Sequence, residues 1–129
     1  YSRTAVETWP LPAVFMCYEI GARIMTGQSL LKLPEDTPVA RAYRLYLGGI
    51  KKDARESWDQ TAVLYAVRGV GPWWTLVTTG HNHVDAEGVN AWRPEPDREH
   101  AYAVEARPPE EVAGLIESLM TQPPKARGE

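Results

Sequence analysis

The sequence has a single cysteine, a single phenylalanine and no long apolar stretch among its 129 residues. Cys17 has no second cysteine with which to form a disulfide inside the chain, which fits a reducing compartment and favours the cytoplasm. It stands in an apolar run, so we expect a small buried thiol there. No apolar run approaches the roughly 18 residues that a membrane-spanning helix needs, so we expect no membrane partner.

Basic residues are also fewer than acidic residues. The 14 Lys and Arg residues are outnumbered by 17 Asp and Glu residues, which gives a net charge of −3. A protein that binds nucleic acid needs a basic field for the phosphates, so we expect no nucleic-acid partner. The chain starts at Tyr1 and not at Met, which predicts a processed chain or a fragment and leaves the compartment open.

What the chain does contain is a regular succession of helix and strand signals, enough for one domain with a sizeable core. Apolar spacing, prolines and glycines predict helices at residues 2–8, 19–26, 38–47, 58–68 and 109–119. Apolar or β-branched runs predict strands at residues 13–17 and 73–79, and alternation predicts a meander of short strands over residues 84–93 and 100–105. The run 50–56 reads as a polar loop. Helices alternate with strands at first and strands cluster later, so we expect α/β layers around a mixed sheet.

The run from Ser57 to Tyr65 places an indole and a carboxylate side by side at the start of a predicted helix. Ser57 and Gln60 have the spacing of a capping box. Asp59 falls in the first turn, where free backbone N–H groups and the helix dipole favour negative charge. The carboxylate would point beyond the helix end, and the Trp58 ring beside it could cover an aromatic ligand, so we expect the two groups to project into one shared pocket. The alternative is an ordinary capped helix with a half-buried tryptophan.

The order of several motifs resembles the C-terminal part of the nucleoside hydrolase family. The motifs that carry the resemblance are Trp9-Pro10-x-Pro12 before an apolar strand, Glu19-Ile20-Gly21, Thr26-Gly27 and Ser57-Trp58-Asp59-Gln60-Thr61-Ala62. It continues into the hairpin around Gly80-His81-Asn82-His83-Val84 and the last helix from Pro109. The resemblance spans nearly the whole chain, but only about the last third to half of a family domain. It is most specific at Trp58-Asp59.

The resemblance implies a three-layer α/β/α fold with a mixed sheet, present here as an incomplete domain. Residues 1–120 would be its C-terminal portion and residues 121–129 a disordered tail. It implies hydrolysis of the N-glycosidic bond of ribonucleosides to free base and ribose, with a calcium ion that orders the water and the ribose hydroxyls. Asp59 stands at the position of the family's C-terminal metal ligand. Trp58 stands where the purine-preferring group has a base-stacking tryptophan, so a purine nucleoside is the expected substrate.

The family's aspartate-rich N-terminal motif, which supplies two metal ligands and the water-activating base, has no counterpart in this sequence. We therefore expect the catalytic residues in a missing N-terminal part. One carboxylate cannot hold calcium tightly when about six to eight oxygen ligands are wanted, so we expect this chain alone to be inactive. The resemblance also implies a homo-oligomer for the full-length protein. The alternative function is that of a catalytically inactive relative that binds a nucleoside or sugar, or serves in assembly.

Other polar and aromatic residues carry weaker functional interpretations. Tyr43 and Tyr46 could reach a bound base, but their helical spacing favours inward packing. Glu19 follows a predicted strand, where ligands of parallel sheets often gather, or is simply a first-turn acid.

The alternating residues His81, His83 and Asp85 share one face of an extended strand, as metal ligands could. A small metalloprotein built on them is a third hypothesis. A polar strand end is the alternative that we favour. We also expect exposed apolar surface where the missing half of the domain would pack.

Overall fold

In the computed structural model, which describes residues 1–123, helices and strands alternate along the first half of the chain and strands cluster in the second half. The helices are α1 (Ser2–Thr8), α2 (Tyr18–Arg23), α3 (Pro38–Ile50), α4 (Trp58–Arg68) and α5 (Pro109–Met120), with a 3-10 turn at Leu30–Lys32. The strands are β1 (Ala13–Phe15), β2 (Met25–Thr26), β3 (Arg55–Glu56), β4 (Trp74–Val77), β5 (His81–Val84), β6 (Asn90–Arg93) and β7 (His100–Glu105).

The main sheet has the order β1-β7-β4 and is mixed. β1 runs parallel to β7, with Phe15 opposite Tyr102, whereas β4 runs antiparallel to β7, with Trp74 opposite Glu105. Two further antiparallel pairs, β2–β3 and β5–β6, lie outside this sheet. Helices together with a mixed sheet confirm the expected α/β class.

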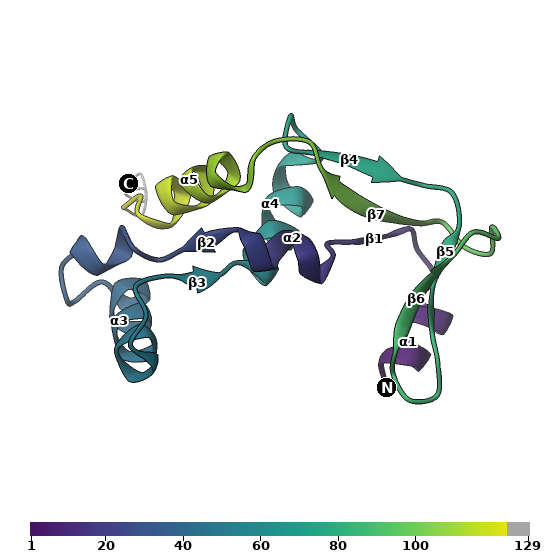
Figure 1. Cartoon of the computed structure of the whole chain (residues 1–129), viewed down its shortest axis with the longest axis horizontal. Helices are drawn as coiled ribbons and strands as arrows, with labels where there is room; N and C mark the ends of the chain where they lie inside the picture. Colours follow the sequence, from purple (N-terminus) through teal and green to yellow (C-terminus); the bar gives the residue numbers. More distant parts are fainter. Residues whose placement is uncertain (124–129) are drawn as a thin grey trace, which may run out of the picture.

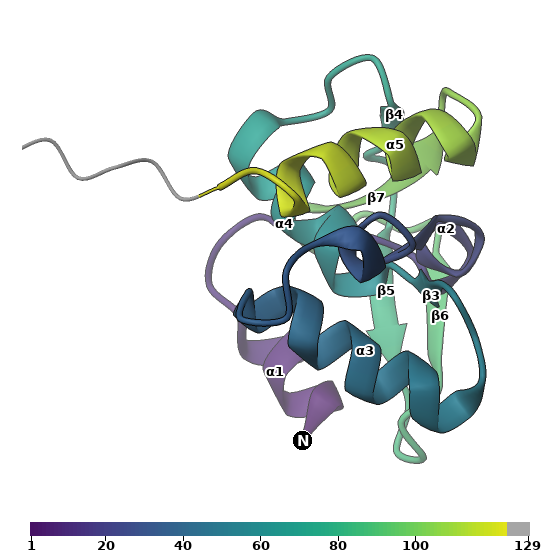
Figure 2. The ribbon, with the colours of Figure 1, turned by 90° about the vertical axis from the view of Figure 1, so that its left-hand side faces the viewer.

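The core lies where α2, α4 and α5 meet the strands β4 and β7 (Figure 2). Its buried residues are Ile20, Ile24, Leu64, Trp74, Ala103, Val112 and Ile116. The helical spacing of Val112 and Ile116 explains why α5 turns these two side chains to the same side.

The carboxylate of Glu117 fastens α5 to the loop that follows β2. It accepts hydrogen bonds from the Gly27 N–H (2.6 Å), the Ser29 N–H (3.3 Å) and the Ser29 hydroxyl. Burial raises the pKa of Glu117, but these hydrogen bonds to the charged form outweigh it and leave the pKa below its ordinary value of 4.5. The loop and the helix are thus held by an ionised side chain.

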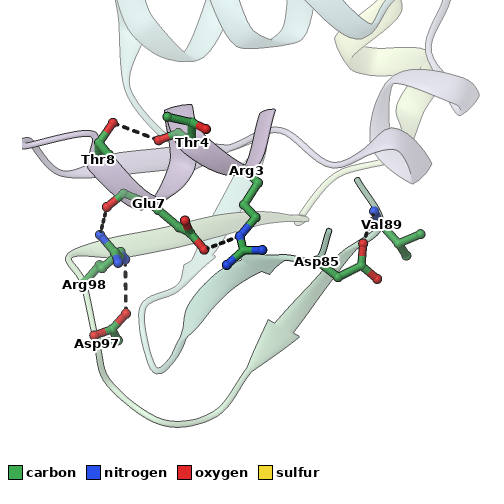
Figure 3. A network of polar contacts seen from close by, with 8 residues as sticks. All are labelled: Arg3, Thr4, Glu7, Thr8, Asp85, Val89, Asp97 and Arg98. Carbon is green, nitrogen blue, oxygen red and sulfur yellow. Dashed lines mark hydrogen bonds and ion pairs between the residues drawn. The ribbon is translucent and has the colours of Figure 1, made fainter. Parts of the chain in front are cut away.

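The molecule is elongated, with α3 at one end and α1 beside the β5–β6 hairpin at the other (Figure 1). Side chains join α1 to the segment between β6 and β7 (Figure 3). The Arg98 guanidinium donates to the Glu7 carbonyl and pairs with Asp97 at 3.1 Å, while Arg3 pairs with the Glu7 carboxylate at 2.7 Å. Of these three contacts, the Arg98–Glu7 hydrogen bond is the one that links α1 to another segment.

Two predicted elements near the candidate site are wrong in extent. The helix expected at 19–26 ends at Arg23, because Met25 and Thr26 pair with Glu56 and Arg55 as β2 and β3. Residues 50–56, expected as a loop, therefore include a short strand at Arg55–Glu56. Pairing between segments about thirty residues apart overrides the local helical pattern here.

Three further boundaries differ from those predicted. β1 covers only residues 13–15, and its residues are half-buried because the strand lies at the edge of the main sheet. The meander of short strands expected from residue 84 begins earlier, because His81–Val84 pair with Asn90–Arg93. The turn between them, residues 85–89, contains Gly88 at φ +88°. α3 runs through Gly48 and Gly49 to Ile50, and Lys51 takes the left-handed conformation that ends it.

The predicted disordered tail, 121–129, falls mainly outside the described residues. At its start, the Thr121 hydroxyl donates to the Glu117 carbonyl at 2.9 Å. Over residues 1–123, no helix combines the length and the hydropathy that crossing a bilayer requires.

Candidate functional site

The start of α4 packs against α2 at a point where only a glycine fits. The Ser57 N–H donates to the Gly21 carbonyl at 3.1 Å. A Cβ atom on Gly21 would lie 2.6 Å from Trp58 Cα and 2.5 Å from Trp58 Cδ1, closer than atoms in real structures approach. Because Gly21 has no side chain, the two helices approach each other closely. This contact brings Glu19-Ile20-Gly21 next to Ser57-Trp58-Asp59.

The predicted capping box at Ser57 and Gln60 is wrong, because both side chains have partners in other elements. Ser57 and Thr26 are fully buried, and their hydroxyl oxygens are 2.6 Å apart. The Gln60 amide donates to the Tyr43 hydroxyl at 2.8 Å. A buried hydroxyl is costly unless it is hydrogen-bonded, and the Thr26 hydroxyl supplies that bond within the fold.

The Trp58 indole is half-buried and its orientation is fixed. Its N–H donates to the backbone carbonyl of Tyr18 at 3.1 Å. The Tyr18 ring stacks on it with ring centroids 5.4 Å apart and an angle of 24° between the planes. Trp58 is therefore a rigid aromatic surface and not part of the central core.

Asp59 lies beside this ring in the first turn of α4 and is exposed to solvent. Among the described residues, its carboxylate takes part in no side-chain hydrogen bond or ion pair. The carboxylate and the indole do leave the same helix end, as the sequence predicts. Neither residue lines the groove beside α2 or the one beside α3, so the structure does not show the two groups projecting into either groove.

The larger groove, of about 970 Å³, has no α4 residue in its wall, and its link to this helix end is Tyr18, which stacks on Trp58. It runs between the main sheet and the β5–β6 hairpin, and Tyr18 and Glu19 of α2 form part of its wall. Glu19 is exposed in the first turn of α2, so both of its proposed roles remain compatible with its position. The Arg23 guanidinium and the Glu105 carboxylate pair at the same wall.

The two tyrosines of α3 behave differently. Tyr43 packs its ring on Gly27 and accepts the hydrogen bond from Gln60, so its inward packing is confirmed. Tyr46 is 46% exposed, and the Arg55 guanidinium lies 4.2 Å from its ring centroid. The prediction of inward packing is thus wrong for Tyr46, because the face it occupies on α3 is covered only by a cationic side chain.

The histidines of the hairpin do not assemble into a metal site within residues 1–123, where no group of three or more potential ligands occurs. His81 Nδ1 donates to the Glu95 carbonyl at 2.7 Å, and the Asp85 carboxylate accepts the Val89 N–H at 2.8 Å. His83 stays on the same strand as His81. The structure favours the interpretation of this run as a polar strand end.

A calcium ion at Asp59 would need ligands beyond those described. Calcium takes about six to eight oxygens, and Asp59 offers at most two. No cluster of three potential side-chain ligands accompanies it in the described part of the chain. Residues 1–123 therefore do not by themselves fit a calcium ion.

The sequence patterns do not indicate the contacts of two residues, Tyr18 and His100. Tyr18 stacks on Trp58 although the two are forty residues apart, and its only sequence signal is its place directly after a strand. His100 is 3% exposed, and its Nδ1 accepts the Asn82 N–H at 3.2 Å. No periodic pattern marks either contact.

Comparison with known proteins adds no relative: no family model, no curated protein and no solved structure matches this chain.

Proposed function

We propose that this chain is the C-terminal part of a three-layer α/β/α nucleoside hydrolase-like domain that cleaves the N-glycosidic bond of purine ribonucleosides. The observation that carries the proposal is the convergence of separate motifs at one helix end. Gly21, Thr26 and the run Ser57-Trp58-Asp59 are distant in sequence but in contact in the fold. The resemblance rests on these same stretches, so their common location supports a shared site.

The proposed role of Trp58 is to stack on the base. An aromatic stacking contact contributes about 1–3 kcal/mol per base. The indole N–H is a donor that does not titrate near neutral pH, and it is already bonded to Tyr18, so Trp58 cannot protonate the leaving base. Its contribution is therefore binding and orientation, not acid catalysis.

The proposed role of Asp59 is to give one oxygen ligand to a calcium ion in the complete domain. Its exposure and its lack of an internal partner among the described residues leave both carboxylate oxygens available. The remaining ligands and the base that activates water would come from a preceding part of a longer chain.

The test measures the cleavage of inosine, adenosine and uridine by the full-length protein in the presence of calcium. Chromatography detects the released base. We expect Asp59→Asn to lower kcat/KM by about 100-fold, a loss typical of a disturbed metal site. Glu110→Gln is the matched control, since Glu110 is likewise an exposed acid in the first turn of a helix. Both variants lose the same favourable interaction with a helix dipole, so only a functional role separates them.

Each outcome has a defined meaning. Equal activity of the Asp59→Asn and Glu110→Gln variants would remove Asp59 from the site. Faster cleavage of uridine than of inosine would contradict the purine preference assigned through Trp58. Binding of inosine by calorimetry without any cleavage would favour the alternative, a catalytically inactive nucleoside-binding relative, which the absence of an acidic cluster among residues 1–123 makes the second candidate.

A further inference from the structure

Tyr18 is an aromatic residue that the fold does not need for its core. It is the first residue of α2, and 68% of its surface is exposed. A tyrosine that buries so little surface contributes little hydrophobic stabilisation. Its ring nevertheless has a defined neighbour, because it lies 5.4 Å from the Trp58 ring at an angle of 24°.

Three contacts fix the Trp58 ring, and two of them come from Tyr18. The Tyr18 ring stacks on one face, and the Tyr18 carbonyl accepts the indole N–H at 3.1 Å. The backbone at Gly21 meets the pyrrole edge of the indole, where a Cβ would be 2.5 Å from Cδ1. One face and one edge of Trp58 are thus occupied from within the chain, and among residues 1–123 no second aromatic ring stacks on the opposite face.

We propose that Tyr18 is a positioning residue that holds the Trp58 ring so that a purine base stacks on the opposite face. The inference rests on the proposed function, since it assigns the ligand face of the same site. A ring that is already fixed loses less rotational freedom when a base stacks on it. Offset stacking of successive rings at 4.5–7 Å between centroids is also a favourable arrangement of aromatic groups.

The two-ring stack predicts selectivity for the larger base. A purine overlaps the indole with two fused rings and a pyrimidine with one. Loss of the Tyr18 ring should therefore weaken inosine binding more than uridine binding. Aromatic pairs contribute enough that we expect about a fivefold rise in KM for inosine, with a smaller change in kcat.

The test uses the full-length protein and the variants Tyr18→Leu, Tyr18→Phe and Trp58→Phe. The first readout is the indole N–H signal of Trp58 in a nitrogen–proton correlation spectrum, identified as the signal that Trp58→Phe removes. The second is KM for inosine and for uridine. We expect Tyr18→Leu to shift the indole signal and raise KM for inosine, whereas Tyr18→Phe, which keeps the ring, behaves like the wild type. The unfolding midpoint should stay the same in the two Tyr18 variants, because Tyr18 is a surface residue.

The outcomes separate this inference from the proposed function. An unshifted indole signal in Tyr18→Leu overturns the positioning role, whatever the activity. A wild type that cleaves inosine together with an unchanged KM in Tyr18→Leu overturns the inference and leaves the proposed function intact. A wild type that neither binds nor cleaves inosine overturns both.

Discussion

Gly21 shows how the absence of one side chain shapes the candidate site. Its position in the first part of the chain looks unremarkable in the sequence, where a glycine inside a short helix lowers helix propensity. In the fold, the space of its side chain is taken by the Cα and the ring of Trp58. The orientation of the indole therefore depends on a residue that makes no side-chain contact of its own.

We expect Gly21→Ala to destabilise the chain by about 1–3 kcal/mol, the cost of overpacking a closed contact. The added Cβ would meet a backbone atom at 2.6 Å, which cannot swing aside as the tip of a flexible side chain can. Urea unfolding measures the change.

The matched control is Gly114→Ala on α5, where nothing lies within 4 Å of the new Cβ. That variant should be neutral or gain up to about 1 kcal/mol from helix propensity. Equal unfolding midpoints for the two variants would show that α2 and α4 are not in close contact.

At the scale of elements, the start of α4 is fixed by a short sheet and a buried pair of hydroxyls. β2 and β3 pair in antiparallel register next to the helix start, and this places Thr26 against Ser57. The two side chains have no exposed surface, so neither hydroxyl can turn to bulk water. The serine that looks like a helix cap in the sequence is in the structure one half of a link between two elements.

We expect Ser57→Ala to cost about 1–3 kcal/mol, because it leaves the Thr26 hydroxyl buried without its partner. Thr26→Val should cost a similar amount for the converse reason. The double variant should cost clearly less than the sum of the two single changes, since replacing both partners removes the unsatisfied group. Urea unfolding of the four proteins measures this coupling. Strictly additive costs would show that the two hydroxyls do not depend on each other.

At the scale of the whole molecule, the β5–β6 hairpin and α1 form one end (Figure 1). The hairpin is joined to the main sheet by an edge-on contact of the Trp92 and Tyr102 rings, 4.7 Å between centroids, and by hydrogen bonds. His100 of β7 is one of these joints, because its Nδ1 accepts the Asn82 N–H of β5. Burial lowers the pKa of His100 below 6.5, and charge interactions with Arg98 and His81 lower it further, against an opposite effect of Asp97.

The lowered pKa of His100 predicts that stability falls in acid. Because the folded chain takes up this proton less readily than the unfolded chain, the contribution of His100 is present above about pH 6.5 and is lost as the pH falls through the lower pKa of the folded state. Protonation of Nδ1 also removes the acceptor for Asn82, a hydrogen bond of the order of 1 kcal/mol. Thermal unfolding between pH 8 and pH 5 measures the effect.

His100→Gln is the comparison for this pH series. The variant keeps a polar side chain but cannot take up a proton, so its stability should fall less between pH 8 and pH 5 than that of the wild type. Parallel curves for the two proteins would show that His100 does not titrate in this range.

The expected exposed apolar surface is present on α4, where Val63 and Val67 are 61% and 75% exposed. They lie four residues apart, so they share one face of the helix, which is next to the face that buries Leu64. That a further part of a longer chain packs on this face stays a prediction.

The sequence by itself determined where most helices and strands lie and which residues form the core of α5. Val112 and Ile116 repeat at helical spacing, and Trp74 stands in a β-branched run, so their burial follows from neighbours along the chain. The pairing of Trp58 and Asp59 at one helix end follows in the same way, because adjacent residues in a first turn cannot separate.

Only the tertiary structure decided how that helix end is built. Ser57 has its partner 31 residues away, and Trp58 receives its hydrogen bond and its stacked ring from a residue forty positions earlier. Such contacts depend on how α2, β2, β3 and α4 come together, and no local period encodes them. Periodicity fixes the face that a side chain takes on its own element, whereas the partner on that face is chosen by the packing of the whole chain.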